Sequence, residues 1–282
     1  MLKRLIITAD DYGMSQAVNK AIDEGIDKGL ITSTNVMTNM PYFKEAKKLG
    51  EISGLSVGMH WNLTCGTPIL PSKDIPTLVA DNGEFFDYPE FRARYRKGAI
   101  KWDDIRKELL AQYELYREYV GEADYWNTHQ NTHVDFDIYK RFVLLAKELG
   151  ISRMRSHQRF YVKGDKNIEK MPLKWRLIEP IKSKMLDVWQ SNAHKKGISS
   201  PNGLVLCLDM VDVYNLEYTF NHIDWKKTDY AEYVIHPATC NDSPYFGEIV
   251  DRRMWEYNAF TSDETKRIIS DAGIKLIDYK EL

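Results

Sequence analysis

The sequence predicts an α/β fold in which residues 1–282 form one domain, a parallel (β/α) barrel that is either regular or deformed. Strand-like and helix-like segments alternate along the chain and give seven or eight strands, the pattern of a parallel α/β fold. The 282 residues, of which 43% are hydrophobic, suffice for one barrel-sized core. An open doubly wound sheet is the alternative, but the turn at Gly13 lacks the spacing of the dinucleotide-binding glycine motif, and no P-loop is present.

The first strand covers residues 5–9, and two acids, Asp10 and Asp11, follow it at a glycine turn. Ser15 then provides an N-cap for a helix whose apolar residues recur on one face. This apolar face consists of Val18, Ala21, Ile22 and Ile26. Residues 31–37 are rich in β-branched side chains and are expected to form the second strand.

A short helix is expected at residues 42–49, ended by Gly50, and a third strand at residues 55–59, which leads into His60. Residues 66–100 then lack periodicity and contain several prolines and an Asn-Gly turn. An irregular stretch of this length after the third strand is typical of a functional loop or a lid. Its aromatic residues indicate that it folds over another part of the protein.

The clearest helix covers residues 103–120, where apolar side chains recur at spacings of three and four. A fourth strand at residues 125–128 leads into His129, and a helix at residues 139–149 ends at Gly150. Residues 151–154 are expected to form a fifth strand that presents Arg153 or Arg155. The later elements are a charged helix at 174–194, strands at 204–208 and 233–235, a helix that begins after Ser262, and a last strand at 274–277.

The composition argues against several classes of function. A formal net charge of −2 argues against a nucleic-acid partner, and the basic clusters at residues 47–48 and 92–97 are expected to be solvated faces. The three cysteines, Cys65, Cys207 and Cys240, form no CxxC motif, so neither a disulfide scaffold nor thiolate zinc binding is indicated. With no signal peptide and no apolar stretch able to cross a bilayer, a soluble cytoplasmic protein without membrane contact is expected.

Four predicted strands each end in an acid or a histidine. Asp10 and Asp11 follow the first strand, and the others lead into His60, His129 and His236. Because the carboxyl ends of barrel strands meet at one face, we expect these side chains to share a pocket. Capping of the next helix would explain one of the two acids but not both, and each histidine taken alone could have an ordinary role.

One carboxylate and two or three imidazoles suit a divalent ion: zinc, cobalt, nickel, manganese or iron, or magnesium with additional waters. Such an ion lowers the pKa of its bound water and polarises a carbonyl oxygen, which suits hydrolysis of an amide or an ester. One aspartate would bind the ion, and the other would accept the proton of the attacking water. His236, on the opposite wall, would protonate the leaving amine.

His129 and His133 have the spacing of the helical zinc-protease motif, but Gln130 stands where that motif has its glutamate. The preceding strand favours a strand-end pair, in which one ring binds the ion and the other supports it or touches the substrate. Solvent-facing loop histidines are the alternative. His157 could approach the pocket after the fifth strand, whereas His194 and His222 are expected on the surface.

Several motifs resemble those of the YdjC-like carbohydrate deacetylases, a family that includes the chitin-disaccharide deacetylases. The matching segments are ITADDYGMS at residues 7–15, GLITST at 29–34 and VGMHWNLT at 57–64. Thr128-His129-Gln130 and His236-Pro237-Ala238 look like the later motifs of the family in order and approximate spacing. The resemblance covers nearly the whole chain.

The resemblance implies a deformed TIM-like barrel that removes an acetyl group from an N-acetylated mono- or oligosaccharide. It implies one divalent ion, magnesium or zinc, with cobalt, nickel and manganese as alternatives. The ion would be held by Asp11, His60 and His129. Asp10 would be the general base, and His236 would assist at the leaving amine or at the developing oxyanion.

Four further residues are assigned to substrate contact or to support of the ligands: His133, Asn62, Trp61 and Arg155. The chain departs from the family's Asp-Ser-His-X-His-Val-His run, because Asn127 replaces the acid and Asn131 the middle histidine. If that acid orients a ligand ring, its loss changes metal affinity or preference. A hydrolase of another amide or ester remains an alternative, and Asn127 and Asn131 leave open a non-catalytic carbohydrate-binding relative. The chain could form a homodimer.

Overall fold

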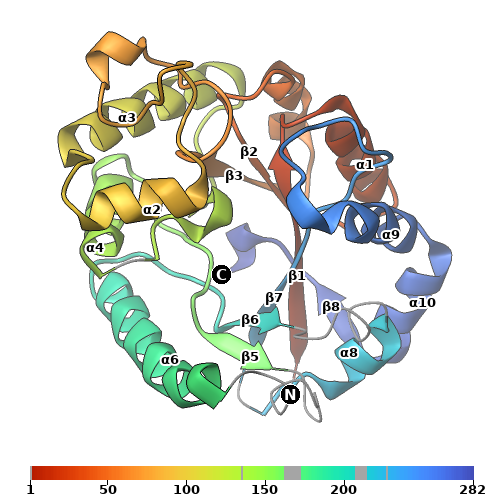
Figure 1. The fold of residues 1–282 in the computed structure, drawn as a ribbon. Coiled ribbons are helices and arrows are strands. Elements are labelled where there is room, and N and C mark those ends of the chain that lie inside the picture. Colours follow the sequence, from red (N-terminus) through yellow and green to blue (C-terminus); the bar gives the residue numbers. More distant parts are fainter. Residues whose placement is uncertain (1, 135, 162–172, 207–214, 227) are drawn as a thin grey trace.

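The computed structural model describes residues 2–134, 136–161, 173–206, 215–226 and 228–282. Eight parallel strands form one curled sheet with the spatial order β4-β3-β2-β1-β7-β6-β5, and β8 also pairs with β1 (Figure 1). The strands are β1 (Lys3–Tyr12), β2 (Ser33–Val36), β3 (Ser56–Trp61), β4 (Trp126–Thr128), β5 (Arg159–Tyr161), β6 (Gly203–Leu206), β7 (Tyr230–Ile235) and β8 (Ile274–Leu276). The predicted α/β barrel fold is confirmed, in a deformed form.

The deformation lies in the wall between β4 and β6. The prediction of a continuous fifth strand at residues 151–154 is wrong, because these residues make only isolated parallel bridges. Met154 bridges to Trp126, and Arg153 bridges to Ser199. The regular strand β5 begins five residues later and pairs with β6. Residues 207 and 208 of the predicted sixth strand lie outside the described residues.

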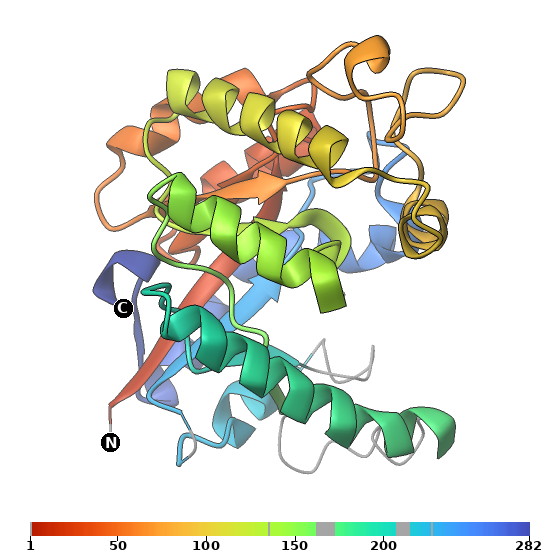
Figure 2. The same ribbon diagram turned by 90° about the vertical axis from the view of Figure 1, so that its left-hand side faces the viewer.

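Helices surround the sheet, as the two perpendicular views show (Figures 1 and 2). They are α1 (Gln16–Asp27), α2 (Tyr88–Arg96), α3 (Trp102–Tyr119), α4 (Phe136–Glu148), α6 (Leu173–His194), α8 (Leu216–His222), α9 (Val250–Phe260) and α10 (Asp263–Asp271). The predicted caps are confirmed at Ser15, whose side chain accepts from Val18 N, and at Ser262, whose side chain accepts from Thr265 N. No helix of the described residues is long and apolar enough to span a membrane.

Two predictions about helices need correction, and two further helices were missed. Residues 43–51 form a 3₁₀ helix that ends at Ile52, so Gly50 is not its cap. The stretch 66–100 contains α2, whose N-cap is Asp87, so it is not wholly irregular. The helices α8 and α9 were not predicted; α8 has only 7 residues, and α9 follows a short 3₁₀ turn without a side-chain cap.

Alternation along β1 separates two faces of the barrel wall. Leu5, Ile7 and Ala9 belong to the main apolar cluster under the helices, whereas Ile6 belongs to a separate small cluster. The small cluster also contains Tyr125 and Tyr279, whose rings stack with centroids 3.8 Å apart, and Ile277. These residues fill the barrel interior, so the same face of the strands leads upward to the polar side chains at their carboxyl ends.

Gly58 on β3 makes room for the stacked rings of Tyr125 and Tyr279 in the barrel interior. A Cβ atom at residue 58 would lie 2.6 Å from the ring of Tyr125. We expect Gly58→Ala to lower the free energy of unfolding by about 1–3 kcal/mol, because the stacked rings cannot move aside in a close-packed interior. Urea denaturation measures the loss. An unchanged free energy of unfolding in Gly58→Ala would contradict the steric argument.

Candidate active site

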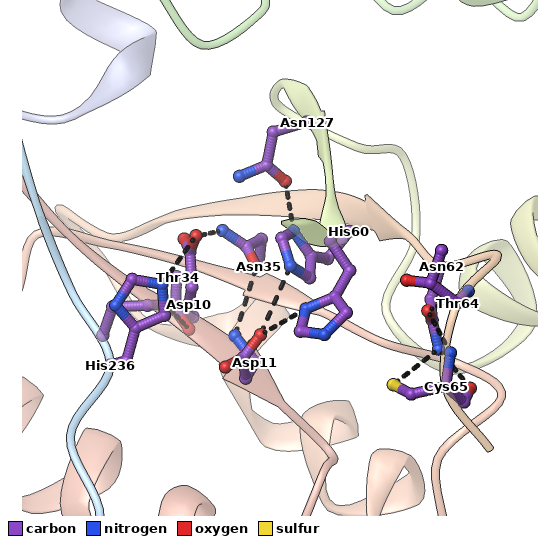
Figure 3. Close-up of polar contacts among 12 residues, drawn as sticks. Asp10, Asp11, Thr34, Asn35, His60, Asn62, Thr64, Cys65, Asn127 and His236 are labelled. Atoms are coloured by element: carbon purple, nitrogen blue, oxygen red, sulfur yellow. Dashed lines mark hydrogen bonds and ion pairs between the residues drawn. The ribbon is translucent and has the colours of Figure 1, made fainter. Parts of the chain in front are cut away.

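Three ligand-type side chains meet at the carboxyl ends of the strands. Asp11 lies at the end of β1, His60 on β3, and His129 directly after β4, and all three are buried. Their donor atoms lie within 4.8 Å of one another. Asp11 Oδ1 is 3.3 Å from His60 Nε2 (Figure 3). The same oxygen is 3.1 Å from His129 Nδ1. The arrangement is a possible site for one metal ion.

A local distortion of β1 brings both aspartates to the pocket. Regular alternation would send Asp10 and Asp11 to opposite faces. Instead, the pairing with β2 shifts register between Ala9 and Tyr12, and Asp11 has a φ of 75°. The non-glycine residues with positive φ in the described chain are Asp11, Gln130 and Asn131, and all three line the same pocket. Strained backbone of this kind is concentrated at functional sites.

Asp11 stays ionised because its neighbours are cationic. Arg253 on α9 donates from Nη2 to Asp11 Oδ2 over 2.7 Å. Burial raises the pKa of Asp11, but the charges of Arg253 and His129 outweigh it and hold the pKa well below its usual range. With Oδ2 engaged by Arg253, Oδ1 is the oxygen left to face the two imidazoles.

His129 carries a proton in the metal-free protein. Burial lowers its pKa, but the neighbouring Cys65 and Asp11 raise it to about 10. A protonated imidazole cannot bind a metal ion, so a cation entering this site would displace the His129 proton.

Asp10 is held by a second arginine. Arg155 donates from Nη1 and Nη2 to the two oxygens of Asp10 over 2.7 and 2.6 Å, and Asn35 donates to Oδ1 over 2.5 Å. Burial raises the pKa of Asp10, but the charge and hydrogen bonds of Arg155 outweigh it and keep the pKa below its usual range. The carboxylate is therefore ionised and fixed in orientation.

His236 follows β7 on the other side of Asp10. Its Nε2 atom lies 3.7 Å from Asp10 Oδ2, and its Nδ1 atom has no hydrogen-bond partner within the described residues. Its backbone N–H donates to Glu256 Oε2 over 2.6 Å. Burial lowers the pKa of His236 to about 4, so its ring is neutral near pH 7.

Asn127 reaches the back of the His60 ring. Its amide lies 2.6 Å from His60 Nδ1. With the amide oxygen toward His60, as Figure 3 shows, Nδ1 carries the proton and Nε2 has a free lone pair. With the amide turned over, its nitrogen donates to Nδ1 and its oxygen accepts from Arg155 over 2.8 Å. The aspartate that the family resemblance expects at residue 127 could only accept a hydrogen bond, so it would fix the proton of His60 on Nδ1. Asn127 can accept or donate, so it is compatible with either tautomer of His60.

These groups line a pocket of about 430 Å³. Asp10, Asp11, His60, His129 and Arg155 line it together with residues 245–249 and Arg252. The long segment after β3 reaches this lining, because Tyr245 donates to Glu84 over 3.3 Å. The sequence-predicted side chains of the first, third, fourth and seventh strands therefore do converge.

Three predicted site residues lie elsewhere. Trp61 is fully buried in the helix-facing core and donates to Leu109 O over 3.1 Å, so its ring offers no face to a sugar. Asn62 closes the turn after β3 by accepting from Thr64 N and donating to Cys65 O. His133 is buried against His157, with their Nε2 atoms 2.9 Å apart, and neither ring lines the pocket.

Two buried residues at the site were missed. Arg253 lies 242 residues from Asp11 in the sequence, within a helix that has no distinctive motif. Glu232, on β7, accepts from Arg155 Nε over 3.1 Å. An acid in the middle of an otherwise apolar strand was a visible signal for Glu232, since such a residue is rarely buried without a partner.

Comparison with known proteins supports this assignment of motifs. The family model described as YdjC-like protein matches residues 4–271. Proteins named carbohydrate deacetylase from Clostridium beijerinckii and carbohydrate deacetylase 2 from Listeria innocua are 27% and 31% identical, over 99% of this chain and 100% and 98% of theirs. A chitooligosaccharide deacetylase from Proteus mirabilis is 25% identical over 100% of both chains.

The fold has a solved counterpart. The crystal structure of a candidate cellobiose-phosphate cleavage protein from Enterococcus faecalis V583 superimposes with a TM-score of 0.75. It is 24% identical and covers 100% of this chain and 99% of that chain, which supports the fold alone. Because the family model spans nearly the whole sequence, the chain belongs to the YdjC-like family.

Proposed function

We propose that this protein is a metal-dependent hydrolase that removes the acetyl group from an N-acetylated mono- or oligosaccharide. The observation that carries the proposal is the convergence of Asp11, His60 and His129 beside a second, arginine-held aspartate in one pocket. The full-length relatives named carbohydrate and chitooligosaccharide deacetylases support the choice of substrate.

The donor set fits a single divalent ion. Asp11 Oδ1, His60 Nε2 and His129 Nδ1 supply one oxygen and two nitrogens, a set that suits zinc, or magnesium with several waters. An ion held by these three residues would supply Lewis acidity toward the acetyl carbonyl and would lower the pKa of a water. Arg253 keeps Oδ2 of Asp11 occupied and so restricts this carboxylate to one oxygen toward the ion.

Asp10 is the base in this proposal. Arg155 holds both of its oxygens, so the carboxylate cannot turn away from the pocket. It is ionised and adjacent to the ligand Asp11, which places a proton acceptor beside the three ligands. A fixed acceptor contributes to the rate because it needs no reorganisation when the proton moves.

His236 is the acid for the leaving amine. Because burial holds its pKa at about 4, the ring is neutral in the resting protein and must first receive a proton. Asp10 Oδ2, 3.7 Å from Nε2, can pass one on after it has taken a proton from water. The two residues then act in sequence on the same acetyl group, Asp10 on the attacking water and His236 on the leaving amine.

Acetate release tests this function directly. We expect the purified protein to release acetate from N-acetylglucosamine or its short oligomers, to lose the activity with a chelator, and to recover it when a divalent ion is added back. The measurement is an acetate assay on sugars of increasing length, with metal content determined in parallel. If no acetylated sugar yields acetate while an ion is bound, the proposal fails; release only from acetyl esters would indicate a different hydrolase.

A further inference from the structure

We propose that Glu232 is a positioning residue that fixes Arg155 and, through it, the base Asp10. The inference rests on the proposed function. Glu232 is fully buried on the interior face of β7 and does not line the pocket, so it cannot touch a substrate. Its influence on the reaction must therefore pass through another side chain.

The hydrogen bonds define that path. Arg155 uses Nη1 and Nη2 to grip the two oxygens of Asp10, over 2.7 and 2.6 Å. The third nitrogen of the guanidinium, Nε, donates to Glu232 Oε1 over 3.1 Å. A guanidinium is planar, so an acceptor on Nε fixes the rotation of the whole group and thereby the plane in which Asp10 is held.

The other side of the Glu232 carboxylate faces the stacked rings of Tyr279 and Tyr125 in the barrel interior. Burial and the charge of Glu232 raise the pKa of the Tyr279 hydroxyl, which places the two groups close together. Tyr279 is stacked on Tyr125, with ring planes 1° apart. The carboxylate is thus confined between an immobile ring and the arginine.

Stability alone does not account for this residue. Asp10 and Arg155 already form a neutral, doubly hydrogen-bonded pair, so a third buried charge adds a desolvation cost that an apolar side chain would avoid. Apolar residues fill the neighbouring interior positions on β1 and near the C-terminus. An acid at residue 232 is therefore best explained by what it does to Arg155.

Glu232→Gln tests the proposal, because glutamine keeps the size and one acceptor oxygen but loses the charge. We expect kcat to fall about tenfold or more, with KM and divalent-ion affinity within about twofold of wild type. We also expect the Arg155 Nε–H signal in NMR, protected from solvent exchange in the wild type, to exchange faster. Glu108→Gln is the matched control. Glu108 is equally buried and accepts from Ile69 N and Leu70 N, away from the pocket, so its loss should lower the melting temperature without lowering kcat.

A double-mutant cycle isolates the path. If Glu232 acts through Asp10, then Glu232→Gln should lower kcat no further once Asp10→Asn is present. Glu232→Asp keeps the charge and provides a second variant with an intermediate kcat if glutamine at this position prevents folding. An unchanged kcat, or a parallel fall of kcat, ion affinity and melting temperature, overturns the proposal. The Arg155 signal reports on the contact even if the wild type releases no acetate, so the two proposals fail separately.

Discussion

Asp10→Asn is expected to lower acetate release by about 1000-fold while leaving the affinity for the divalent ion close to that of the wild type. The loss corresponds to removal of one positioned general base, which contributes roughly 10²- to 10⁴-fold. The fold should survive, because Arg155 keeps its ion pair with Glu232 and the amide can still accept one guanidinium hydrogen bond. Steady-state kinetics and calorimetric titration with the ion measure the two quantities.

Asp11→Asn is the matched comparison, since the two acids are neighbours of the same type with different partners. Asp11 lies within 3.3 Å of a ring nitrogen of His60 and of His129. Asp10 instead lies beside His236, with 3.7 Å between Oδ2 and Nε2. We expect the variant at residue 11 to lose ion affinity as well as turnover. Normal turnover in Asp10→Asn would show that another group takes the proton, and a loss of ion affinity equal to that of Asp11→Asn would show that both acids bind the ion.

Convergence of the four strand ends could be predicted because it follows from the topology of a parallel barrel. Asp11, His60 and His129 are far apart in sequence, but each stands at the carboxyl end of a strand, and these ends share one face. What the pattern could not supply is the bulge at Asp11, since a left-handed aspartate depends on the pairing of β1 with β2 and on the hydrogen bond to Asn35.

The position of Trp61 outside the pocket illustrates the period of a strand. Trp61 follows His60 directly, so once His60 points into the barrel, Trp61 must point to the helices, and its packing against Phe142 confirms this. The alternation of side chains could have been predicted from the sequence. It decides the orientation of Trp61 even though Trp61 is next to His60 in the chain. His133 differs, because its position depends on the turn with left-handed Gln130 and Asn131, which no local motif predicts.

The interruption of the fifth strand and the role of Arg253 lay beyond prediction for another reason. Residues 151–154 have the composition of a strand, but only isolated bridges form there, and Arg155 instead turns inward to Asp10. Arg253 reaches Asp11 from α9, 242 residues later in the sequence. Both depend on long-range charge pairing inside the barrel, which requires all the partners to be placed first.

His60→Ala is expected to weaken ion binding by about 100-fold or more and to abolish acetate release with it. Loss of a group that merely supports a ligand costs roughly 10- to 100-fold in affinity, and removal of a ligand nitrogen should cost at least the upper value. Asp11 would keep His129 and Arg253 as partners, so its charge stays compensated and the barrel should still fold. Calorimetric titration, circular dichroism and the acetate assay measure affinity, fold and turnover on the same preparation.

His194→Ala is the control for this variant, because His194 is an exposed histidine on α6 whose ring bonds to Ser200, outside the pocket. It should change neither ion affinity nor turnover. Exogenous imidazole offers a further check, since it can occupy the space left by the His60 ring and supply the missing nitrogen. If His60→Ala binds the ion as tightly as the wild type, the imidazole at residue 60 is not a ligand, and the cluster around Asp11 is a buried ion-pair network instead of a metal centre.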